Sequence, residues 1–551
     1  MKPGPNGESD VDKPTDGGTG SVDEIIIGLP DGIDDHADAA IRHVPPGSEI
    51  IDTNETLGFA VARLPKESNT PAQIARIDDR DDVRYAEANG TMTADGPPFP
   101  AESLELATAV TPDDTYYDGQ NAPTQVNAPA AWDTTLGSSD VTIAVLDTGT
   151  KYDHEDLAAN MDDSTYSAPD GADQSYDPSN HGWDFINKDN DPYPDSFDSP
   201  VESHGTSVSG IAGAVTDNGT GVAGISNCSL LSVRVLNEDG SGTLSLIANG
   251  IEWAASNGAD IINMSLGTDL RSDFPSETIG DALTYAKNNG ALCIAAAGNN
   301  DEETSTYSPA GQDPCMAVSA LNTNEERAST NQWGSNWGDY VDLAAPGTHH
   351  DVDSDQQSTY PADPENGGKA DEYWKFNGTS MAAPVIAGVA GLVLSVDDSL
   401  SIDQLESTLK DTAKDVGLDP KKQGAGQVDA GAAVDSVATL SLDVLGDSIP
   451  QDGDASIPIS TTAADTVVVE DLWLDWSDAG TLSWDADADS VDDRSDTEGT
   501  ITFSWNSTQS ADFTLTISPP SRYVGGEYLL SVSASDSTET VETTASLTIE
   551  N

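Results

Sequence analysis

The segment that most constrains the fold of this chain runs from residue 376 to residue 396. It begins FNGTSMAAP, with Ser380 directly after a glycine turn, and continues as a run that is apolar on nearly every helical face. A helix without a polar face has to be buried inside a large core. Its N-terminus carries positive dipole potential, which stabilises developing negative charge. Ser380 is therefore either an N-cap that satisfies the first helical amides or a nucleophile.

Three other segments supply what a serine nucleophile needs. Residues 141–147 form a continuous apolar run that ends in Asp147, which predicts a buried parallel strand with the acid at the sheet edge where α/β folds place their chemistry. His204 opens a second small, apolar helix, and Asn299 follows an apolar strand. A serine hydroxyl needs a base, an imidazole needs a carboxylate that fixes its tautomer, and an oxyanion needs an amide donor. Taken alone, His204 would be a surface or satisfied core residue, and Asp147 and Asn299 would be turn residues. The four residues together predict acyl transfer.

The sequence around these residues resembles that of the subtilisin-like serine proteases, the subtilases. The resemblance covers residues 111–437 and rests on four motifs in the family's order: DTG at 147–149, HGT at 204–206, AAGN at 296–299 and GTSMAxP at 378–384. It implies that Asp147 orients His204, that His204 is the general base and then the acid, and that Ser380 forms the acyl-enzyme. It also implies an oxyanion hole made by Asn299 and the Ser380 amide. A backbone edge for substrate, to which a peptide adds as a strand, is implied at Ser265, Leu266 and Gly267.

The charge of the chain is strongly acidic. Its 551 residues include 97 Asp and Glu against 22 Lys and Arg, a formal net charge of -75. Such an excess is typical of disorder, but the long buried-strand and buried-helix patterns favour a folded core with an acidic surface. Self-repulsion destabilises that state in dilute buffer, and concentrated salt screens it. The chain therefore resembles the halolysins, the subtilases of halophilic archaea. The absence of a basic patch disfavours nucleic-acid binding, no transmembrane run is expected, and we expect a monomer.

Five regions are predicted along the chain. Residues 1–21 are expected to be disordered. Residues 22–92 show a β-α-β-β-α-β pattern, which indicates a ferredoxin-like α+β unit and resembles a subtilase propeptide of the I9 inhibitor type; an unrelated α+β unit is the alternative. Residues 93–110 form a linker in which self-cleavage is expected, and 111–438 form an α/β peptidase domain with a doubly wound parallel sheet. Residues 440–551 show alternating strands, which predict a small antiparallel β-sandwich.

Calcium is implied by resemblance to the thermitase-like subtilases. The first site would use Asp114, Asp156 and Asn218 side chains with the carbonyls of Val215, Thr220 and Val222. A second site would use Asp184, Asp189 and Asp191, with the Tyr193 carbonyl. The polar insertion at 348–372 is expected to be a surface loop; His349 and His350 with two aspartates could bind a metal there, but a solvated loop is favoured.

Two further points remain open from the sequence. The cysteines, Cys228, Cys293 and Cys315, cannot all pair within one chain; Cys228 and Cys315 could. The N-terminus shows no apolar leader and no twin arginine. Because halolysins are secreted through a twin-arginine leader, we expect an extracellular protein whose leader is missing from this sequence, with a cytoplasmic location as the alternative.

The predicted function is a salt-adapted serine endopeptidase, calcium-stabilised and made as a self-processing precursor that its own propeptide inhibits. Its substrates are peptides and proteins. The alternatives are an intracellular processing or quality-control subtilase and an inactive subtilase-like binding protein. Family resemblance implies cleavage after bulky apolar residues, whereas Asp301, Glu302 and Glu303 could attract basic ones.

Overall fold

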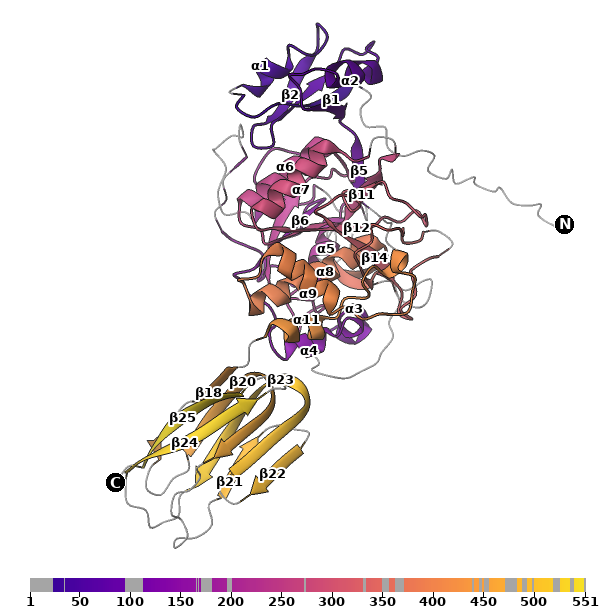
Figure 1. Cartoon of the computed structure of the whole chain (residues 1–551). Coiled ribbons are helices and arrows are strands. Elements are labelled where there is room, and N and C mark those ends of the chain that lie inside the picture. Colours follow the sequence, from indigo (N-terminus) through magenta and orange to yellow (C-terminus); the bar gives the residue numbers. More distant parts are fainter. Residues whose placement is uncertain are drawn as a thin grey trace, which may run out of the picture.

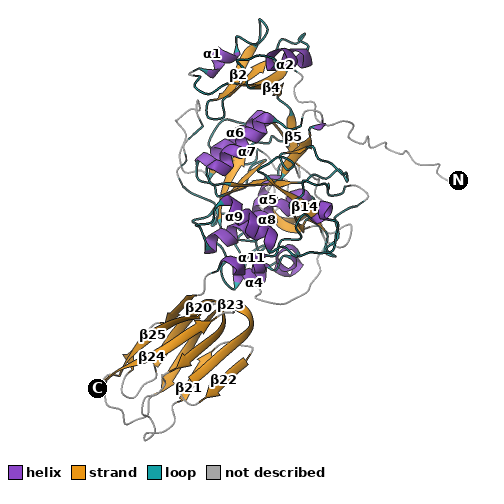
Figure 2. Cartoon of the chain, in the orientation of Figure 1, coloured by secondary structure: helices purple, strands orange, loops and turns teal. Residues whose placement is uncertain are grey.

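The structure is a computed structural model that describes residues 23–94, 112–169, 181–195, 201–348, 356–361 and 371–438, apart from residues 34, 165, 167, 272–273 and 331–332. It also describes the strands between residues 441 and 549. Figure 1 shows three parts in sequence order, from the indigo N-terminal unit to the yellow strands near the C-terminus, and Figure 2 shows their helices and strands. The predicted disorder of residues 1–21 and most of the linker at 93–110 lie outside the described residues.

The N-terminal unit has the predicted β-α-β-β-α-β order. Its four strands form one antiparallel sheet in the order β2-β3-β1-β4, which is the ferredoxin-like arrangement. Strand β1 is buried along its whole length because isoleucines on both faces are covered. The elements are β1 (Glu24–Gly28), α1 (His36–Ala40), β2 (Glu49–Asn54), β3 (Phe59–Arg63), α2 (Thr70–Asp78) and β4 (Tyr85–Ala88).

The central domain contains a seven-stranded, fully parallel sheet in the order β15-β14-β12-β10-β6-β8-β7. Strands β8 and β7 lie on one side of β6, and β10, β12, β14 and β15 follow one another outward on the other side. The carboxyl end of β6 therefore lies at the point where the winding reverses. This confirms the predicted doubly wound sheet. The strands are β6 (Thr142–Asp147), β7 (Gly182–Asp184), β8 (Ser229–Arg234), β10 (Ile261–Met264), β12 (Leu292–Ala296), β14 (Met316–Leu321) and β15 (Leu343–Pro346).

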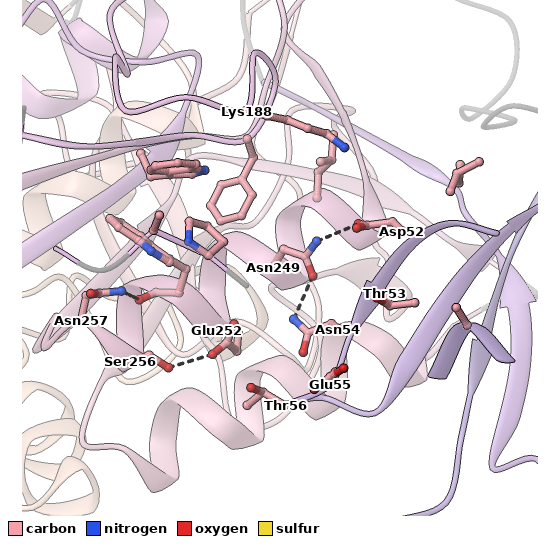
Figure 3. A pocket seen from close by; sticks show the side chains of 18 of the residues that line it. Asp52, Thr53, Asn54, Glu55, Thr56, Lys188, Asn249, Glu252, Ser256 and Asn257 are labelled. Atoms are coloured by element: carbon pink, nitrogen blue, oxygen red, sulfur yellow. Dashed lines mark hydrogen bonds between the residues drawn. The ribbon is translucent and has the colours of Figure 1, made fainter. Parts of the chain in front are cut away.

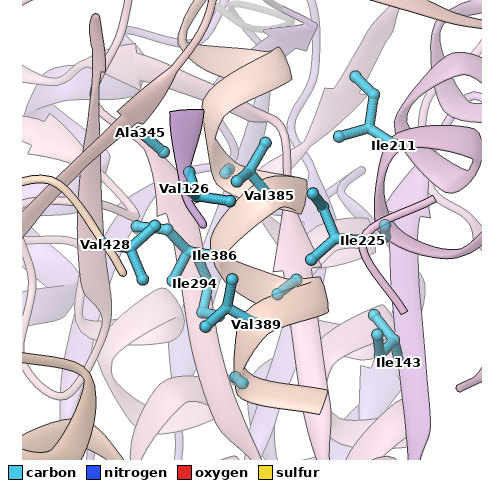
Figure 4. Packing of buried hydrophobic residues seen from close by; sticks show 14 of the residues in the cluster. Val126, Ile143, Ile211, Ile225, Ile294, Ala345, Val385, Ile386, Val389 and Val428 are labelled. Atoms are coloured by element: carbon cyan, nitrogen blue, oxygen red, sulfur yellow. The ribbon is translucent and has the colours of Figure 1, made fainter. Parts of the chain in front are cut away.

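Helices cover both faces of this sheet, and each face has its own core. On β6, Ile143 and Val145 belong to the core under α5 (His204–Gly213) and α8 (Thr379–Val396), whereas Ala144 and Leu146 belong to the core under α6 (Leu244–Ser256) and α7 (Glu277–Asn288). This follows from the two-residue alternation of strand side chains. Figure 4 shows the valines and isoleucines of α8 packed among strand side chains.

Helix α8 is the buried helix that the sequence predicts. By length and composition it could cross a membrane, but 89% of it is buried inside the protein. Residues 379–394 are all buried. Its apolar character is therefore explained by the core that surrounds it.

Shorter elements complete the central domain. A four-stranded sheet joins β5 (Thr91–Ala94), β9 (Ser241–Thr243), β11 (Leu266–Asp269) and β13 (Tyr307–Ser308). The helices are η1 (Tyr117–Gly119), α3 (Ala122–Gln125), α4 (Ala128–Trp132), α9 (Ile402–Asp411), α10 (Pro420–Gln423) and α11 (Ala430–Val437). Part of the predicted loop at 348–372 is instead an antiparallel hairpin of β16 (Gln356–Pro361) and β17 (Asp371–Phe376), so the loop prediction was wrong there.

The C-terminal strands are mainly antiparallel, as the alternating pattern predicts. They join one hydrogen-bonded set, and among the described strand pairs of this region only β19–β25 is parallel. The packing of two sheets as a sandwich is not confirmed and stays a prediction. The strands are β18 (Ser441–Val444), β19 (Ser448–Ile449), β20 (Ala455–Glu470), β21 (Ser483–Asp487), β22 (Asp493–Thr497), β23 (Thr500–Ser518), β24 (Gly526–Ser535) and β25 (Thr540–Ile549).

Candidate active site

An acid and an imidazole meet at the carboxyl end of β6. Asp147 is the last residue of β6 and His204 is the first residue of α5. His204 Nδ1 lies 2.9 Å from both carboxylate oxygens of Asp147, and both side chains are buried. Gly205 permits this approach, because a Cβ there would lie 3.0 Å from the Asp147 Cβ and 2.4 Å from the Gly149 carbonyl oxygen. The contact makes Nδ1 the donor and Nε2 the basic nitrogen of the ring.

Ser380 lies in the first turn of α8, which packs against α5. The N-cap of α8 is Gly378, with φ 137°, and no side chain of the described part of the chain caps this helix end. The alternative role of Ser380 as an N-cap is therefore wrong. Its hydroxyl donates to the Ser265 carbonyl at 3.1 Å, and the Ser265 hydroxyl donates to the Ser380 carbonyl at 2.7 Å. This reciprocal pair fixes the serine to the end of β10.

Asn299 is oriented by the residue that precedes the serine. Its Oδ1 accepts from the backbone amide of Thr379 at 2.9 Å and from the Thr379 hydroxyl at 3.1 Å. The same hydroxyl accepts from the amide of Gly298 at 3.1 Å. With Oδ1 held by two donors, the Asn299 amide nitrogen has no hydrogen-bond partner among the described residues, although it is buried. A buried N–H group without an acceptor, close to a nucleophile, can donate a hydrogen bond to an oxyanion.

The predicted substrate edge carries a strand from the N-terminal part of the chain. Strand β5 lies antiparallel between β11 and β9, with Ala94 paired to Leu266, Thr93 paired to Gly267 and Met92 paired to Gly242. Met92 is fully buried. The next position of the β11 ladder is Ser265, whose carbonyl accepts the Ser380 hydroxyl. The chain thus places its own strand where an added peptide strand would bind.

The N-terminal unit is also anchored at the start of α7. Glu87 accepts from the Ser276 hydroxyl at 3.0 Å and from the amides of Thr278 at 2.9 Å and Glu277 at 3.3 Å. A carboxylate at a helix N-terminus interacts favourably with the helix dipole. Burial nevertheless raises the pKa of Glu87 above its ordinary value. Arg84 adds an ion pair to Asp281 at 2.8 Å.

A cavity of about 540 Å³ lies between β2 and α6, with Trp183 and Trp253 among its apolar lining residues. At its edge, Asn249 donates to Asp52 at 3.0 Å and accepts from Asn54 at 2.9 Å, as Figure 3 shows. Burial raises the pKa of Asp52, and Lys188 partly offsets this effect. The carboxyl group of Asp52 therefore belongs to a part-buried hydrogen-bond chain between the two units.

The side chains of the first predicted calcium site lie together. Asn218 Nδ2 donates to Asp156 at 2.9 Å, and Asp114 accepts from the amides of Asp217 at 2.8 Å and Asn218 at 3.5 Å. Asp156 also accepts from the Val222 amide at 2.8 Å, and its own carbonyl accepts from the Val215 amide at 2.9 Å. Thr220 follows in the same loop and donates its amide to Asn218.

These residues fit a cation in their chemistry. Asp156 is fully buried, and burial raises its pKa to about 7, with the Asp114 charge adding to the shift. Burial also raises the pKa of Asp114. A positive ion would stabilise the charged forms of both carboxylates, and oxygen donors are the ligands of Ca²⁺.

The second predicted calcium site is arranged differently. Asp184 forms a buried ion pair with Arg234 at 2.9 Å and accepts from the amides of Ile186 and Asn187. Asp189 accepts from the Asp191 amide at 3.0 Å, and Asp191 accepts from the Tyr152 hydroxyl at 2.9 Å. Within the described ranges, no three His, Cys, Asp or Glu side chains form a metal-binding group. Arg234 thus already compensates the most buried acid of this set.

The three cysteines are buried and free, so the possible Cys228–Cys315 disulfide is not formed.

The sequence did not reveal the roles of Thr379 and the Ser265 hydroxyl. Both are small polar residues, and their partners lie 80 and 115 residues away along the chain. The only signal was their position: Thr379 stands directly before the predicted nucleophile, and Ser265 directly after a predicted buried strand.

Comparisons with known proteins agree with this geometry. Residues 138–427 match the Subtilase family (peptidase S8), and residues 13–89 match the Fervidolysin N-terminal prodomain. The chain is 43% identical over 415 residues to "Halolysin" of Haloferax mediterranei, which covers 75% of this chain and 69% of that protein. It is 41% identical over 450 residues to "Halolysin-like extracellular serine protease Nep" of Natrialba magadii, covering 80% and 73%. A solved protease from Pseudoalteromonas arctica is 34% identical with a TM-score of 0.50, covering 60% of this chain and all of that one.

Proposed function

Because this chain belongs to the subtilase family and is a serine endopeptidase, we propose that it is secreted, works in concentrated salt and cuts peptide bonds through Ser380, His204 and Asp147. The extracellular location is supported by the similarity to Nep, an extracellular serine protease. Salt adaptation is supported by the net charge of -75, because self-repulsion of that size is relieved by screening.

In the proposed reaction, the Ser380 hydroxyl oxygen attacks the carbonyl carbon of the scissile bond and its proton passes to His204 Nε2. Asp147 stabilises the imidazolium that forms. The negative charge on the carbonyl oxygen is met by the Asn299 amide and the backbone amide of Ser380. His204 then gives the proton to the leaving amine. A water molecule, activated by the same imidazole, hydrolyses the acyl-enzyme.

One observation carries this proposal: the Asn299 amide is buried, has no partner among the described residues, and is aimed by a residue adjacent to Ser380. Burying a polar donor without a partner costs about 1–3 kcal/mol. A developing oxyanion would supply the missing partner. Nothing in a purely structural role for Asn299 would require that open donor.

We also propose that the chain is a precursor that processes itself. The N-terminal unit (22–92) acts as the inhibitor, and its continuation, β5, takes the place of substrate beside Ser265. Cleavage is proposed shortly after Ala94, inside the linker at 93–110, which would leave the peptidase domain (111–438) and the C-terminal strands (440–551). The match to a prodomain at 13–89 supports this order.

Calcium is proposed as a structural ion at the first site. The side chains of Asp114, Asp156 and Asn218 would hold it, together with the predicted carbonyls of the loop at 215–222. The ion would neutralise the two buried acids and so stabilise that loop. The second site, at Asp184, Asp189 and Asp191, remains a weaker proposal because Arg234 already pairs with Asp184.

The test uses the full chain in concentrated salt, with peptide hydrolysis and N-terminal sequencing as readouts. The proposal expects hydrolysis and a new N-terminus within 93–110. Ser380→Ala should abolish both, whereas Ser399→Ala, at an exposed turn after α8, should change neither. A Ser380→Ala protein that still hydrolyses peptides, or that processes itself alone, would refute the proposal.

A further inference from the structure

We propose that Tyr307 restricts the substrate residue on the acyl side of the scissile bond to a small side chain. The inference rests on the proposed function and adds a substrate preference to it. It replaces the expectation that cleavage follows bulky apolar residues.

The position of that substrate residue follows from the groups already described. Its carbonyl carbon must lie at the Ser380 hydroxyl, and its oxygen must reach the Asn299 amide. Its backbone must continue the ladder that β5 forms with β11, in which Thr93 pairs with Gly267 and Ala94 with Leu266. The side chain of this residue therefore enters the space between two backbone segments, 265–267 and 298–299.

The ring of Tyr307 lies in that space. A Cβ on Gly267 would lie 2.4 Å from Tyr307 Cε1, and a Cβ on Gly298 would lie 2.5 Å from Tyr307 Cζ. The two glycines belong to the two opposite segments, so the ring spans the gap from one to the other. Gly267 does not have the left-handed backbone that would by itself favour glycine. The space taken by the ring explains why Gly267 carries no side chain. At Gly298 the left-handed backbone (φ 98°) and Asn336 Nδ2, 2.4 Å from a Cβ there, favour glycine as well.

The ring is held in place. Tyr307 belongs to β13, which pairs with β11 through Asp269 and Thr268, and its carbonyl accepts from the Gly311 amide at 2.6 Å. It is 2% exposed and packs in the same core as Leu266. Moving the ring aside for a large substrate side chain would disrupt this packing, and forcing extra atoms into a close-packed site is destabilising.

Two of the three acids that could attract a basic substrate residue, Asp301 and Glu303, are already paired. Asp301 accepts from Arg327 at 2.6 Å, and Glu303 pairs with Lys421 at 2.7 Å. The chain's own sequence where β5 ends, Thr93-Ala94-Asp95-Gly96, contains no large side chain. Both observations agree with a preference set by size.

The experiment compares the processed enzyme on peptides that differ only at the acyl-side residue: Ala, Leu, Phe or Lys. We expect kcat/KM for Ala to exceed that for Phe by at least about tenfold, the scale on which pockets discriminate by size. Tyr307→Gly should reverse this preference, so that kcat/KM for Phe exceeds that for Ala by at least about tenfold. Tyr307→Phe, which keeps the ring, should leave the ratio of Ala to Phe within about twofold of the wild-type value.

The outcomes separate this inference from the proposed function. A wild-type enzyme that cuts after Phe as fast as after Ala overturns the inference alone, even if Tyr307→Gly does not fold. An unchanged ratio in a folded Tyr307→Gly protein does the same. Hydrolysis of none of the peptides overturns the proposed function and this inference with it.

Discussion

Replacement of Thr379 by valine tests whether the oxyanion donor is positioned from the adjacent helix. Valine keeps the shape of threonine but lacks the hydroxyl. The change removes the 3.1 Å bond to Asn299 Oδ1 and leaves the Gly298 amide without the acceptor it has at 3.1 Å. The backbone bond from residue 379 to Asn299, at 2.9 Å, remains. The Asn299 side chain therefore keeps one of the two hydrogen bonds that position it.

The expected magnitudes follow from these two bonds. A buried amide left without an acceptor costs about 1–3 kcal/mol, so the free energy of unfolding should fall by about 2 kcal/mol. Loss of an oxyanion donor lowers kcat by about 10²–10³-fold. Because one of the two bonds that aim Asn299 survives, we expect a smaller decrease in kcat, about tenfold, with KM little changed.

The assay is a double-mutant cycle with Asn299→Leu, measured as kcat on one peptide in concentrated salt. If Thr379 acts through Asn299, Thr379→Val should reduce kcat in the wild-type background but hardly at all in the Asn299→Leu background. Thr379→Ser, which keeps the hydroxyl, is the matched control and should retain most of the activity. An equal loss of kcat in both backgrounds would refute the positioning role, because the effect would then be independent of Asn299.

Three further predictions concern the propeptide and the cation. Glu87→Gln should raise the dissociation constant of the cleaved propeptide by about tenfold, because an amide donor replaces one of the two carboxylate oxygens that accept at the start of α7 and leaves an N–H there without its acceptor; the lag before peptide hydrolysis should shorten, and an unchanged lag would contradict the anchoring role. Burial raises the pKa of Asp52 in the complex, so the complex binds the proton more tightly than the separated units do. The affinity of the peptidase domain for the propeptide should therefore be highest at low pH and should decrease as pH rises through the raised pKa of Asp52. Size-exclusion chromatography at a series of pH values should show dissociation of the propeptide as the pH rises. Asp52→Asn, which can still accept from Asn249, should reduce the pH dependence of this dissociation. Dissociation that increases toward low pH would contradict the role of Asp52. Chelation of calcium should lower the Tm of the processed enzyme by several degrees, since a ligand bound only by the folded state stabilises it. Asp156→Asn should make the Tm insensitive to chelation, whereas an equal drop in both proteins would exclude the first site.

The sequence predicted the elements whose signal is local. The run at 141–147 could be a buried strand because it is apolar without alternation, and the helix after Ser380 had to be central because no face of it is polar. The N-terminal unit was also predictable from the order of its strands and helices.

What the sequence did not predict depends on contacts between distant residues. Strand β5 pairs with β11 more than 170 residues later, and nothing within Thr91–Ala94 indicates that partner. Tyr307 looks like an ordinary core aromatic residue until the two glycines against its ring are known. The hairpin of β16 and β17 is not predicted because polar and charged residues dominate residues 348–372, and the apolar alternation of Trp374 and Phe376 is confined to the end of β17.

The most direct test of the account is the site of reaction with a fluorophosphonate, which labels an activated serine nucleophile. The processed enzyme is treated in concentrated salt and the adduct is located by peptide mapping. We expect one adduct, on Ser380, which is lost in Ser380→Ala and forms much more slowly in His204→Ala. An unlabelled Ser380 in a protein that hydrolyses peptides, or labelling of Ser380 at the same rate without His204, would contradict it.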